Sequence, residues 1–368
     1  MSDDSKRVII LSGVRTPIAS FKGSFSSVSS AELGSIAARE AVKRSGLAPE
    51  VIEESFVGSV LTANCGQNVA RQVAIGAGIP KSSQAVTINK VCSSSMKALA
   101  LASLSIKAGY RQITLVGGVE NMSQVPFYQA RTEPPYGGFQ IVDGIVRDGL
   151  QDAMLNQAMG NCAEKSVRDY KISREAQDAF AVGSYKKAAA AWKEGKFVEE
   201  VMPVTIKPKR GPELIVAEDE EYKKLIESKV PSLSPVFIRD GTGTITAANA
   251  SSLNDGAVAA VVTSAAAIPA GAQPLAEILH FTESGGEPID FTVAPVWAAK
   301  QLLQQAGLNA ADIALWEVNE AFSVTVLAFI QELGLDASKV NIKGGAVALG
   351  HPLGFDNCLK TFLSTSQV

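Results

Sequence analysis

Short apolar runs alternate with longer apolar segments over the first third of the chain, and this pattern predicts a layered α/β unit. Residues 8–11 are the first short run, and strand and helix signals alternate from there to Met122. The β-branched run at 84–89 predicts a buried strand. Residues 93–108 are apolar on most faces and are followed by Gly109, which predicts a helix.

The pattern changes after residue 123. Prolines, a Lys-Pro-Lys-Arg-Gly-Pro turn and the charged run 218–224 interrupt it as far as about residue 240, although 174–193 predicts a helix. These charges alone indicate a solvated surface. Further on, the segment that starts at residue 313 predicts a strand running into an apolar helix at 324–333.

Cys92 stands between a predicted strand and a predicted helix, at or just before the first helical turn. Unsatisfied N–H groups and the positive end of the helix dipole stabilise an anion there, and the thiolate is the nucleophilic form of a thiol. Position alone leaves a second interpretation open, because a lone intracellular cysteine is more often a small buried apolar residue. Cys92 is therefore a candidate nucleophile.

A glycine-rich turn at 341–354 carries His351, one of only two histidines in the chain. Its glycines permit backbone angles that other residues rarely adopt, and Pro352 stiffens the loop directly after the imidazole. The other histidine, His280, alternates with apolar residues as an ordinary strand residue does. Asn319 follows the strand predicted from residue 313, where open α/β sheets hold catalytic groups, but a helix N-cap is an equally good interpretation.

Composition sets limits and does not identify a function. The chain has 368 residues, 46% of them hydrophobic and 19% charged, which suffices for a large core and roughly two or three domains. A net charge of −3 argues against nucleic acid as the main partner. The four cysteines have no C-x-x-C spacing, so neither a zinc site nor a disulfide framework is indicated. No apolar run is long enough to predict a transmembrane helix.

Five motifs resemble the thiolase family and occur in the family's order. They are V-C-S-S-S-M-K-A from Val91, G-G-V-E-N-M-S from Gly117, A-A-N-A-S from Ala247, N-E-A-F from Asn319 and G-G-A-V-A-L-G-H-P-L-G from Gly344. Within the family the chain is most similar to the animal mitochondrial, potassium-responsive acetoacetyl-CoA thiolases. That similarity rests on P-Y-G-G at 135–138, S-Y at 184–185 and E-P-I-D-F at 287–291.

The resemblance implies a thiolase-like α/β fold of two similar layered α/β halves with an inserted loop domain. We expect an N-terminal half at residues 1–122 and a C-terminal half at 251–368. Residues 123–250 are expected to form the loop domain that covers coenzyme A and to return to the core.

The resemblance also implies an acetyl-CoA C-acetyltransferase, which reversibly condenses two acetyl-CoA molecules to acetoacetyl-CoA through an acyl group on Cys92. Cys92 matches the family's nucleophile, and His351 matches the base that deprotonates it. Asn319 matches the residue that holds a water near the thioester oxygen. A neutral imidazole suits such a base near pH 7.

Two sets of ligand contacts carry over from the family. The residues that match coenzyme A contacts are Tyr185, Lys224, Leu225, Ile226, Lys229 and Ser251. The residues that match a potassium site are Tyr185 and, through their carbonyl oxygens, Ala247, Ala248, Ala250 and Val347. Coenzyme A thioesters are thus the expected substrates and potassium an expected ion, and no redox cofactor is implied.

The sequence after Gly354 departs from the family, which continues into S-G-A-R and later into a C-x-G-G-G turn with a second acid/base cysteine. Residues 355–368 contain neither motif, and Cys358 has no C-x-G context. We therefore expect an incomplete second half, in which Cys92 is acylated and condensation is lost. The alternatives to full activity are an impaired truncated thiolase, a non-catalytic dimerisation partner, or a 3-ketoacyl-CoA thiolase of broader chain length.

Partners and location follow from the same observations. The family implies acetyl-CoA and acetoacetyl-CoA as partners, together with a homodimer or homotetramer. The first residues enter the first strand at once, which leaves no room for a transit peptide and predicts the cytoplasm. The resemblance favours mitochondria as the alternative.

Overall fold

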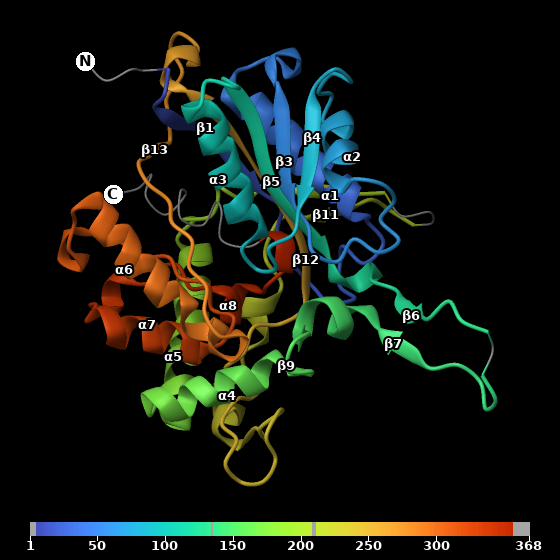
Figure 1. Cartoon of the computed structure of the whole chain (residues 1–368), viewed down its shortest axis with the longest axis vertical. Helices are drawn as coiled ribbons and strands as arrows, with labels where there is room; N and C mark the ends of the chain where they lie inside the picture. Colours follow the sequence, from blue (N-terminus) through green and yellow to red (C-terminus); the bar gives the residue numbers. More distant parts are fainter. Residues whose placement is uncertain (1–4, 134, 208–210, 356–368) are drawn as a thin grey trace.

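A mixed sheet of seven strands frames the N-terminal part of the molecule (Figure 1). The computed structural model describes residues 5–133, 135–207 and 211–355. In order across the sheet the strands are β13 (Ala276–Ile278), β1 (Val8–Arg15), β12 (Asn254–Ser264), β5 (Ile113–Asn121), β3 (Glu54–Gly58) and β4 (Gln84–Ile88), and β2 (Ala19–Ser20) pairs with β12. Neighbours from β13 to β5 are antiparallel, and β5, β3 and β4 are parallel.

Helices cover both faces of this sheet. The helices α1 (Ser30–Ser45) and α2 (Val69–Gly76) pack on one face, and α3 (Ser94–Lys107) packs on the other. In β12, Val258 and Val262 face α3, whereas Val261 faces α1 and α2. Apolar residues at consecutive positions are what a strand buried on both faces requires, so this arrangement confirms the α/β prediction.

The strand β4 lies at an edge of the sheet, and the prediction that it is buried is wrong. Its residues alternate between exposed and half-buried as far as Thr87, and the Val86 side chain is 39% exposed. Among the described residues, this strand has one neighbour, β3, on one of its two sides. A β-branched run predicts a strand but does not distinguish a central strand from an apolar edge.

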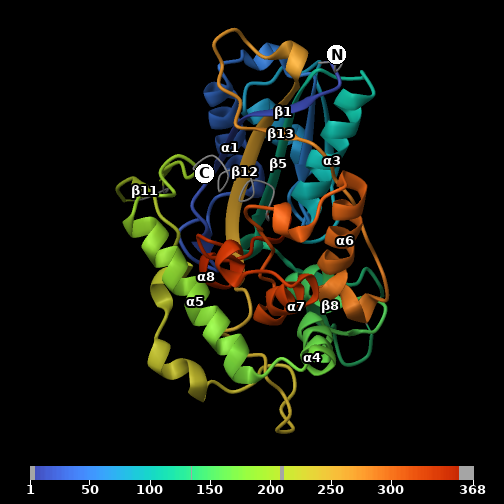
Figure 2. The same cartoon turned by 90° about the vertical axis from the view of Figure 1, so that its left-hand side faces the viewer.

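Five helices lie beyond one end of the sheet, as two perpendicular views show (Figure 1, Figure 2). They are α4 (Met159–Tyr170), α5 (Arg174–Lys193), α6 (Ala294–Ala306), α7 (Ser323–Leu333) and α8 (Ala346–Leu349). The helices predicted at 174–193 and 324–333 are confirmed by α5 and α7. Residues of α5 and α8 join the apolar core beneath the sheet, whereas α4, α6 and α7 pack on one another.

The strand predicted from residue 313 is wrong. Within the part of the chain that the structure describes, Trp316 makes a single bridge, to Val340, and the helix that follows starts at Ser323. The side-chain amide of Asn341 accepts a hydrogen bond from the N–H of Val318 (2.8 Å) and donates one to its carbonyl (2.9 Å). A side chain therefore satisfies the backbone groups that a neighbouring strand would otherwise bind.

The expectation that His280 is a strand residue is also wrong. The strand β13 ends at Ile278, because its pairing partner β1 begins at Val8, directly opposite. His280 lies two residues beyond that end and is exposed. Its alternation with apolar residues therefore continues past the last strand partner.

Three small two-stranded sheets complete the described fold. They are formed by β6 (Phe127–Gln129) with β7 (Ile141–Asp143), β8 (Gln151–Asp152) with β9 (Gln157–Ala158), and β10 (Val204–Ile206) with β11 (Leu214–Val216). The β6–β7 hairpin projects away from the body of the molecule (Figure 1). Within the described ranges, no helix combines the length and the apolar character needed to cross a membrane.

Arg15 ties the end of β1 to segments from the middle of the chain. Its side chain is only 2% exposed and pairs with Glu200 (Nε to Oε1, 2.7 Å) and Asp219 (Nη1 to Oδ1, 2.7 Å). Asp219 also accepts the backbone N–H of Ile18 (2.7 Å) and the indole N–H of Trp192 (3.1 Å). Buried charges that satisfy one another are tolerated, whereas removal of one partner leaves an uncompensated charge.

We expect Arg15→Ala to lower the free energy of unfolding by about 3 to 5 kcal/mol, because Glu200 and Asp219 lose their buried partner. The matched control is Arg7→Ala, which removes a partly exposed ion pair with Glu277 and is expected to cost less than about 1 kcal/mol. Urea-induced unfolding of both variants measures the difference. Equal losses for the two variants would contradict a structural role of the buried cluster.

Candidate active site

Cys92 lies in a strained turn immediately before α3. The preceding residue, Val91, has φ of +48°, an unfavourable backbone angle for a β-branched residue. Hydrogen bonds hold this turn, since Val91 donates its N–H to Asn89 Oδ1 (3.0 Å) and accepts the Ser94 hydroxyl at its carbonyl (2.6 Å). Cys92 is half-buried at this turn. The predicted placement of Cys92 before the first helical turn is confirmed.

His351 is buried, with 4% of its surface exposed, in a loop that follows α8. Gly350 precedes it with φ of +105°, a conformation that favours glycine. The backbone N–H of His351 donates to Asn254 Oδ1 (2.8 Å), and the Asn254 amide donates in turn to the carbonyl of Ala19 (3.0 Å). Asn254 begins β12 and is fully buried, so the imidazole is anchored to the central sheet.

Asn319 faces the imidazole. The side-chain amide nitrogen Nδ2 of Asn319 lies 3.4 Å from Nε2 of His351, so the amide is next to this ring nitrogen. Its Oδ1 is buried and has no hydrogen-bond partner among the described residues. The N-cap of α7 is Phe322, so the alternative that Asn319 caps this helix is wrong.

Apolar packing brings Cys92 to the loop of His351. Cys92 packs against a cluster that contains Leu61, Met122 and Leu353, and Leu353 stands two residues after His351. The fold thus brings the turn of Cys92 to a loop about 260 positions later in the sequence, and Asn319 contacts the imidazole of that loop.

Glu320 is a fully buried acceptor next to the predicted potassium residues. Its carboxylate binds the Ser184 hydroxyl (2.7 Å), the Asn341 amide (2.8 Å) and the N–H of Val347 (3.1 Å). Burial, together with the negative charges of Glu221 and Glu320, raises the pKa of Tyr185 to about 12. The negative charge near this phenol favours a cation over an anion.

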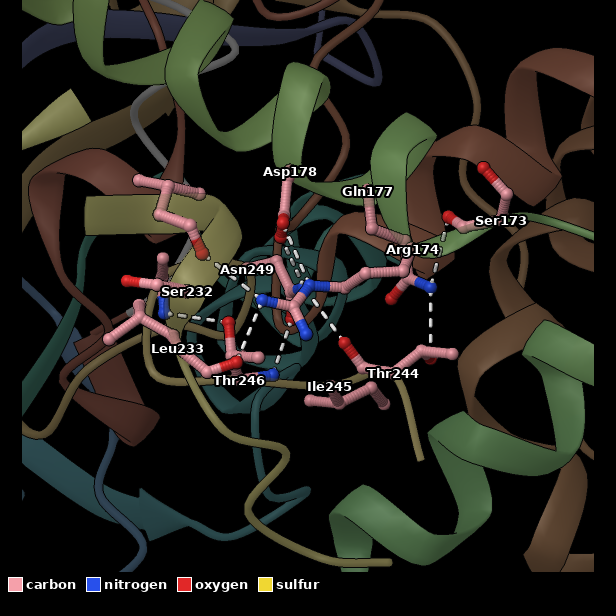
Figure 3. Close-up of polar contacts among 12 residues, drawn as sticks. Ser173, Arg174, Gln177, Asp178, Ser232, Leu233, Thr244, Ile245, Thr246 and Asn249 are labelled. Atoms are coloured by element: carbon pink, nitrogen blue, oxygen red, sulfur yellow. Dashed lines mark hydrogen bonds and ion pairs between the residues drawn. The ribbon is translucent and has the colours of Figure 1, made fainter. Parts of the chain in front are cut away.

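The predicted carbonyl ligands lie in a segment that a polar network holds in place (Figure 3). Asn249 donates its side-chain amide to Asp178 (2.9 Å) and accepts the N–H of Thr246 (2.8 Å). Its carbonyl accepts the N–H of Ser323 at the start of α7 (2.9 Å). The segment that contains Ala247, Ala248, Ala250 and Ser251 is therefore fixed against both α5 and α7.

Arg174 joins this network to the second predicted coenzyme A segment. Its guanidinium pairs with Asp178 (2.7 Å) and donates to the carbonyls of Val230 (3.1 Å) and Leu233 (3.0 Å). Val230 follows Lys229 directly, and Lys229 and Ile226 are exposed to solvent. The network thus connects segment 224–233 to segment 244–251, which carry the predicted coenzyme A contacts other than Tyr185.

The Lys224 side chain is hydrogen-bonded to neighbouring side chains in this structure. Its ammonium group donates to Glu221 (2.9 Å) and to the Ser20 hydroxyl (2.5 Å). Leu225 is half-buried beside it. Within the described ranges, no group of three or more His, Cys, Asp and Glu side chains is arranged to hold a metal ion.

Sequence reasoning assigned no role to Asn254 or Glu320. Glu320 stands inside the quoted N-E-A-F motif, which is the signal that could have found it. Asn254 carries no comparable signal, because only the fold shows that it reaches His351. The expectation of an altered, incomplete second half concerns residues 356–368, including Cys358, which lie outside the described residues.

Comparisons with known proteins agree with this geometry. The chain is 51% identical over 349 residues to the mitochondrial acetyl-CoA acetyltransferase of Danio rerio, and the match covers 94% of this chain and 83% of that protein. It is 49% identical over 350 residues to the Homo sapiens protein of the same name, with coverages of 95% and 82%. The crystal structure of Acat5 thiolase from Ascaris suum in complex with coenzyme A superposes with a TM-score of 0.94 and 55% sequence identity, covering 98% of this chain and 92% of that one.

Both halves of one family match the sequence. The thiolase N-terminal domain matches residues 8–266, and the thiolase C-terminal domain matches residues 272–365. The fold resemblance that five short motifs implied is thereby confirmed over almost the whole length. The chain belongs to the thiolase family.

Proposed function

We propose that the chain is an acetyl-CoA C-acetyltransferase, which transfers acetyl groups between coenzyme A thioesters through Cys92. The observation that carries this proposal is the contact between Asn319 and Nε2 of a buried His351, in a loop packed against the turn of Cys92. The named activity of the relatives from Danio rerio and Homo sapiens supports it.

Cys92, His351 and Asn319 each have a separate role in the proposed acyl-transfer step. His351 Nε2 takes the proton of the Cys92 thiol, and the thiolate sulfur attacks the acetyl thioester carbon. A carbon–sulfur bond to Cys92 forms, the bond to coenzyme A breaks, and the proton held by His351 passes to the departing thiolate. Asn319 orients the imidazole and leaves Oδ1 as the acceptor for a water that polarises the thioester oxygen.

We expect acetyl-CoA to acetylate Cys92 and Cys92→Ser to abolish this adduct, because an alcohol beside a neutral imidazole is a far weaker nucleophile than a thiol. Asn319→Ala should slow acetylation by about 10² to 10³, the usual effect of losing one polar group at such a site. Cys65→Ser, which removes another half-buried cysteine, should leave the adduct intact. Peptide mass spectrometry after rapid quenching measures all three. Acetylation of the Cys92→Ser variant at the wild-type rate would contradict the assignment.

Thiolysis of acetoacetyl-CoA distinguishes the full activity from its alternatives. Steady turnover supports the transferase, and comparable turnover of longer 3-ketoacyl-CoA substrates would assign a broader thiolase. An adduct without turnover would assign an impaired enzyme. Absence of both would leave a non-catalytic dimerisation partner as the function.

We further propose that coenzyme A lies along segments 224–233 and 244–251, and that potassium binds beside them. The Ascaris suum structure in complex with coenzyme A supports coenzyme A as the ligand, and the exposure of Ile226 and Lys229 leaves segment 224–233 accessible to it. The buried carboxylates near Tyr185 support the potassium site, because potassium prefers oxygen ligands in negative surroundings. When bound, the ion would neutralise this charge and order the alanine segment.

Potassium chloride should raise the Tm of the wild-type chain by about 2 to 4 °C over sodium chloride at equal ionic strength, since an ion that binds the folded state stabilises it. Tyr185→Phe should lose most of this difference. Tyr222→Phe, which removes a hydroxyl bonded to Glu218, is the matched control and should keep it. An unchanged potassium effect in Tyr185→Phe would place the ion elsewhere.

We also propose that the chain forms homo-oligomers through the edge strand β4. Exposed apolar side chains lie along this edge and the start of α3, at Val86 (39%), Val91 (43%) and Met96 (47%). An unpaired apolar edge of this kind is a surface for a second copy of the chain.

Val86→Lys should shift the chain to a smaller species, because it places a charge on the edge strand. Val198→Lys changes an exposed valine outside the sheet (70% exposed) and should not. Light scattering coupled to size-exclusion chromatography measures both masses. Identical masses for the two variants would exclude β4 as the interface.

The names of the relatives favour the mitochondrial alternative for location over the cytoplasmic expectation. We propose a mitochondrial location on that ground. Imaging of the natural full-length protein in its own cells tests it.

A further inference from the structure

Glu120 is a fully buried carboxylate at the carboxyl end of β5, and the acyl-transfer step described above does not use it. Its Oε2 accepts the N–H of Val60 (2.9 Å) and of Gly354 (2.9 Å), and its Oε1 accepts the N–H of Leu61 (3.0 Å). Val60 and Leu61 follow β3, and Gly354 stands three residues after His351. One carboxylate therefore joins β5, the loop after β3 and the loop of the proposed base.

The glycine-rich loop lies directly on the end of β5. Gly118 has no Cβ, and one placed there would collide with the carbonyl of Gly354 and the side chain of Ser95. Ser95, three residues after Cys92, donates its hydroxyl to the carbonyl of Phe355 (3.2 Å). Sequence reasoning assigned no role to the G-G-V-E-N-M-S motif. In the structure this motif packs against both the glycine-rich loop of His351 and the start of α3, which follows Cys92.

A buried carboxylate is costly unless other groups compensate its charge. Burial raises the pKa of Glu120 to about 7, while the three N–H donors and the charge of protonated His351 act in the opposite direction. The ionisable groups that interact with Glu120 electrostatically include His351 and Cys65. Of these two, His351 gains a positive charge during the reaction, and a negative neighbour stabilises that charged form.

We propose that Glu120 is a positioning residue of the acyl-transfer site, whose carboxylate holds the loop of His351 against the start of α3 and stabilises the imidazolium formed when His351 takes the Cys92 proton. This inference rests on the proposed roles of Cys92 and His351. The proton moves from Sγ to Nε2, and no bond of Glu120 forms or breaks.

Asp255 provides a matched control for a carboxylate buried at the same end of the sheet. It is fully buried in β12, and its neighbour Gly256 pairs with Glu120 in β5. Its carboxylate accepts the N–H (2.9 Å) and the hydroxyl (2.5 Å) of Ser123. Burial raises its pKa as well, to about 6. Asp255→Asn therefore tests loss of a buried charge without loss of the bond to Gly354.

The experiment measures alkylation of Cys92 by iodoacetamide against pH in the full chain, with site-resolved mass spectrometry. Alkylation follows the thiolate fraction and requires no acetyl-CoA. For Glu120→Gln we expect the midpoint to move to higher pH by about one unit, because an imidazolium without its negative neighbour supports the thiolate less well. Acetylation by acetyl-CoA should slow by about 10²-fold through misplacement of His351. Asp255→Asn should change neither quantity by more than about twofold.

Urea unfolding of each variant monitors folding. If Glu120→Gln does not fold, Glu120→Asp replaces it, since the shorter side chain keeps the charge and loses the reach to Gly354. That variant should slow acetylation and leave the alkylation midpoint close to wild type. Equal pH profiles and equal acetylation rates for the Glu120 and Asp255 variants would overturn the proposal. A wild-type chain that is alkylated at Cys92 but never acetylated would instead overturn the proposed function, and the alkylation midpoints would still decide the role of Glu120.

Discussion

The pairing of β12 with β1 and β5 is the constraint on which the rest of the structure depends. This strand comes from residues 254–264, yet it lies between two strands formed by the first 121 residues. Every one of its residues is buried, and without this strand β1 and β5 would lose the pairing partner between them. The same strand begins with Asn254, which holds the backbone of His351. The strand that completes the central sheet therefore also positions the proposed base.

Buried carboxylates fix the loops around the site. Glu164 binds the N–H of Thr244 (2.7 Å) and of Ile245 (2.8 Å), while Glu120 and Glu320 bind the segments on either side of His351. A loop has few backbone hydrogen bonds of its own, so an acceptor that takes several N–H groups determines its position. Desolvation of the carboxylate opposes this, and its several donors offset the cost. The site is precise because its loops are bound to charges rather than packed on apolar residues alone.

Sequence patterns predicted the parts that depend on local order. The periodicity of residues 174–193 and the position of Cys92 before a helix are local properties, and both appear in the structure. The edge position of β4 and the role of Asn341 beside Val318 could not be predicted, because each depends on what lies next to the segment in space. Family resemblance supplied Cys92, His351 and Asn319 together. Glu120 and Glu320 stand inside family motifs, but only the structure shows which loops they hold, and Asn254 carried no pattern at all.

The raised pKa values of Glu120 and Asp255 link folding to proton uptake. Both groups titrate higher in the folded chain, at about 7 and about 6, than their ordinary values of 4.5 and 3.8. For each group, at a pH between its ordinary pKa and its pKa in the folded chain, the folded state holds a proton that the unfolded state has released. The free energy of unfolding is therefore highest at low pH and declines as the pH rises through the pKa of each group in the folded chain. At neutral pH the carboxylate of Glu120, which binds the loop of the proposed base, therefore makes folding itself less favourable, an example of a site maintained at the expense of stability.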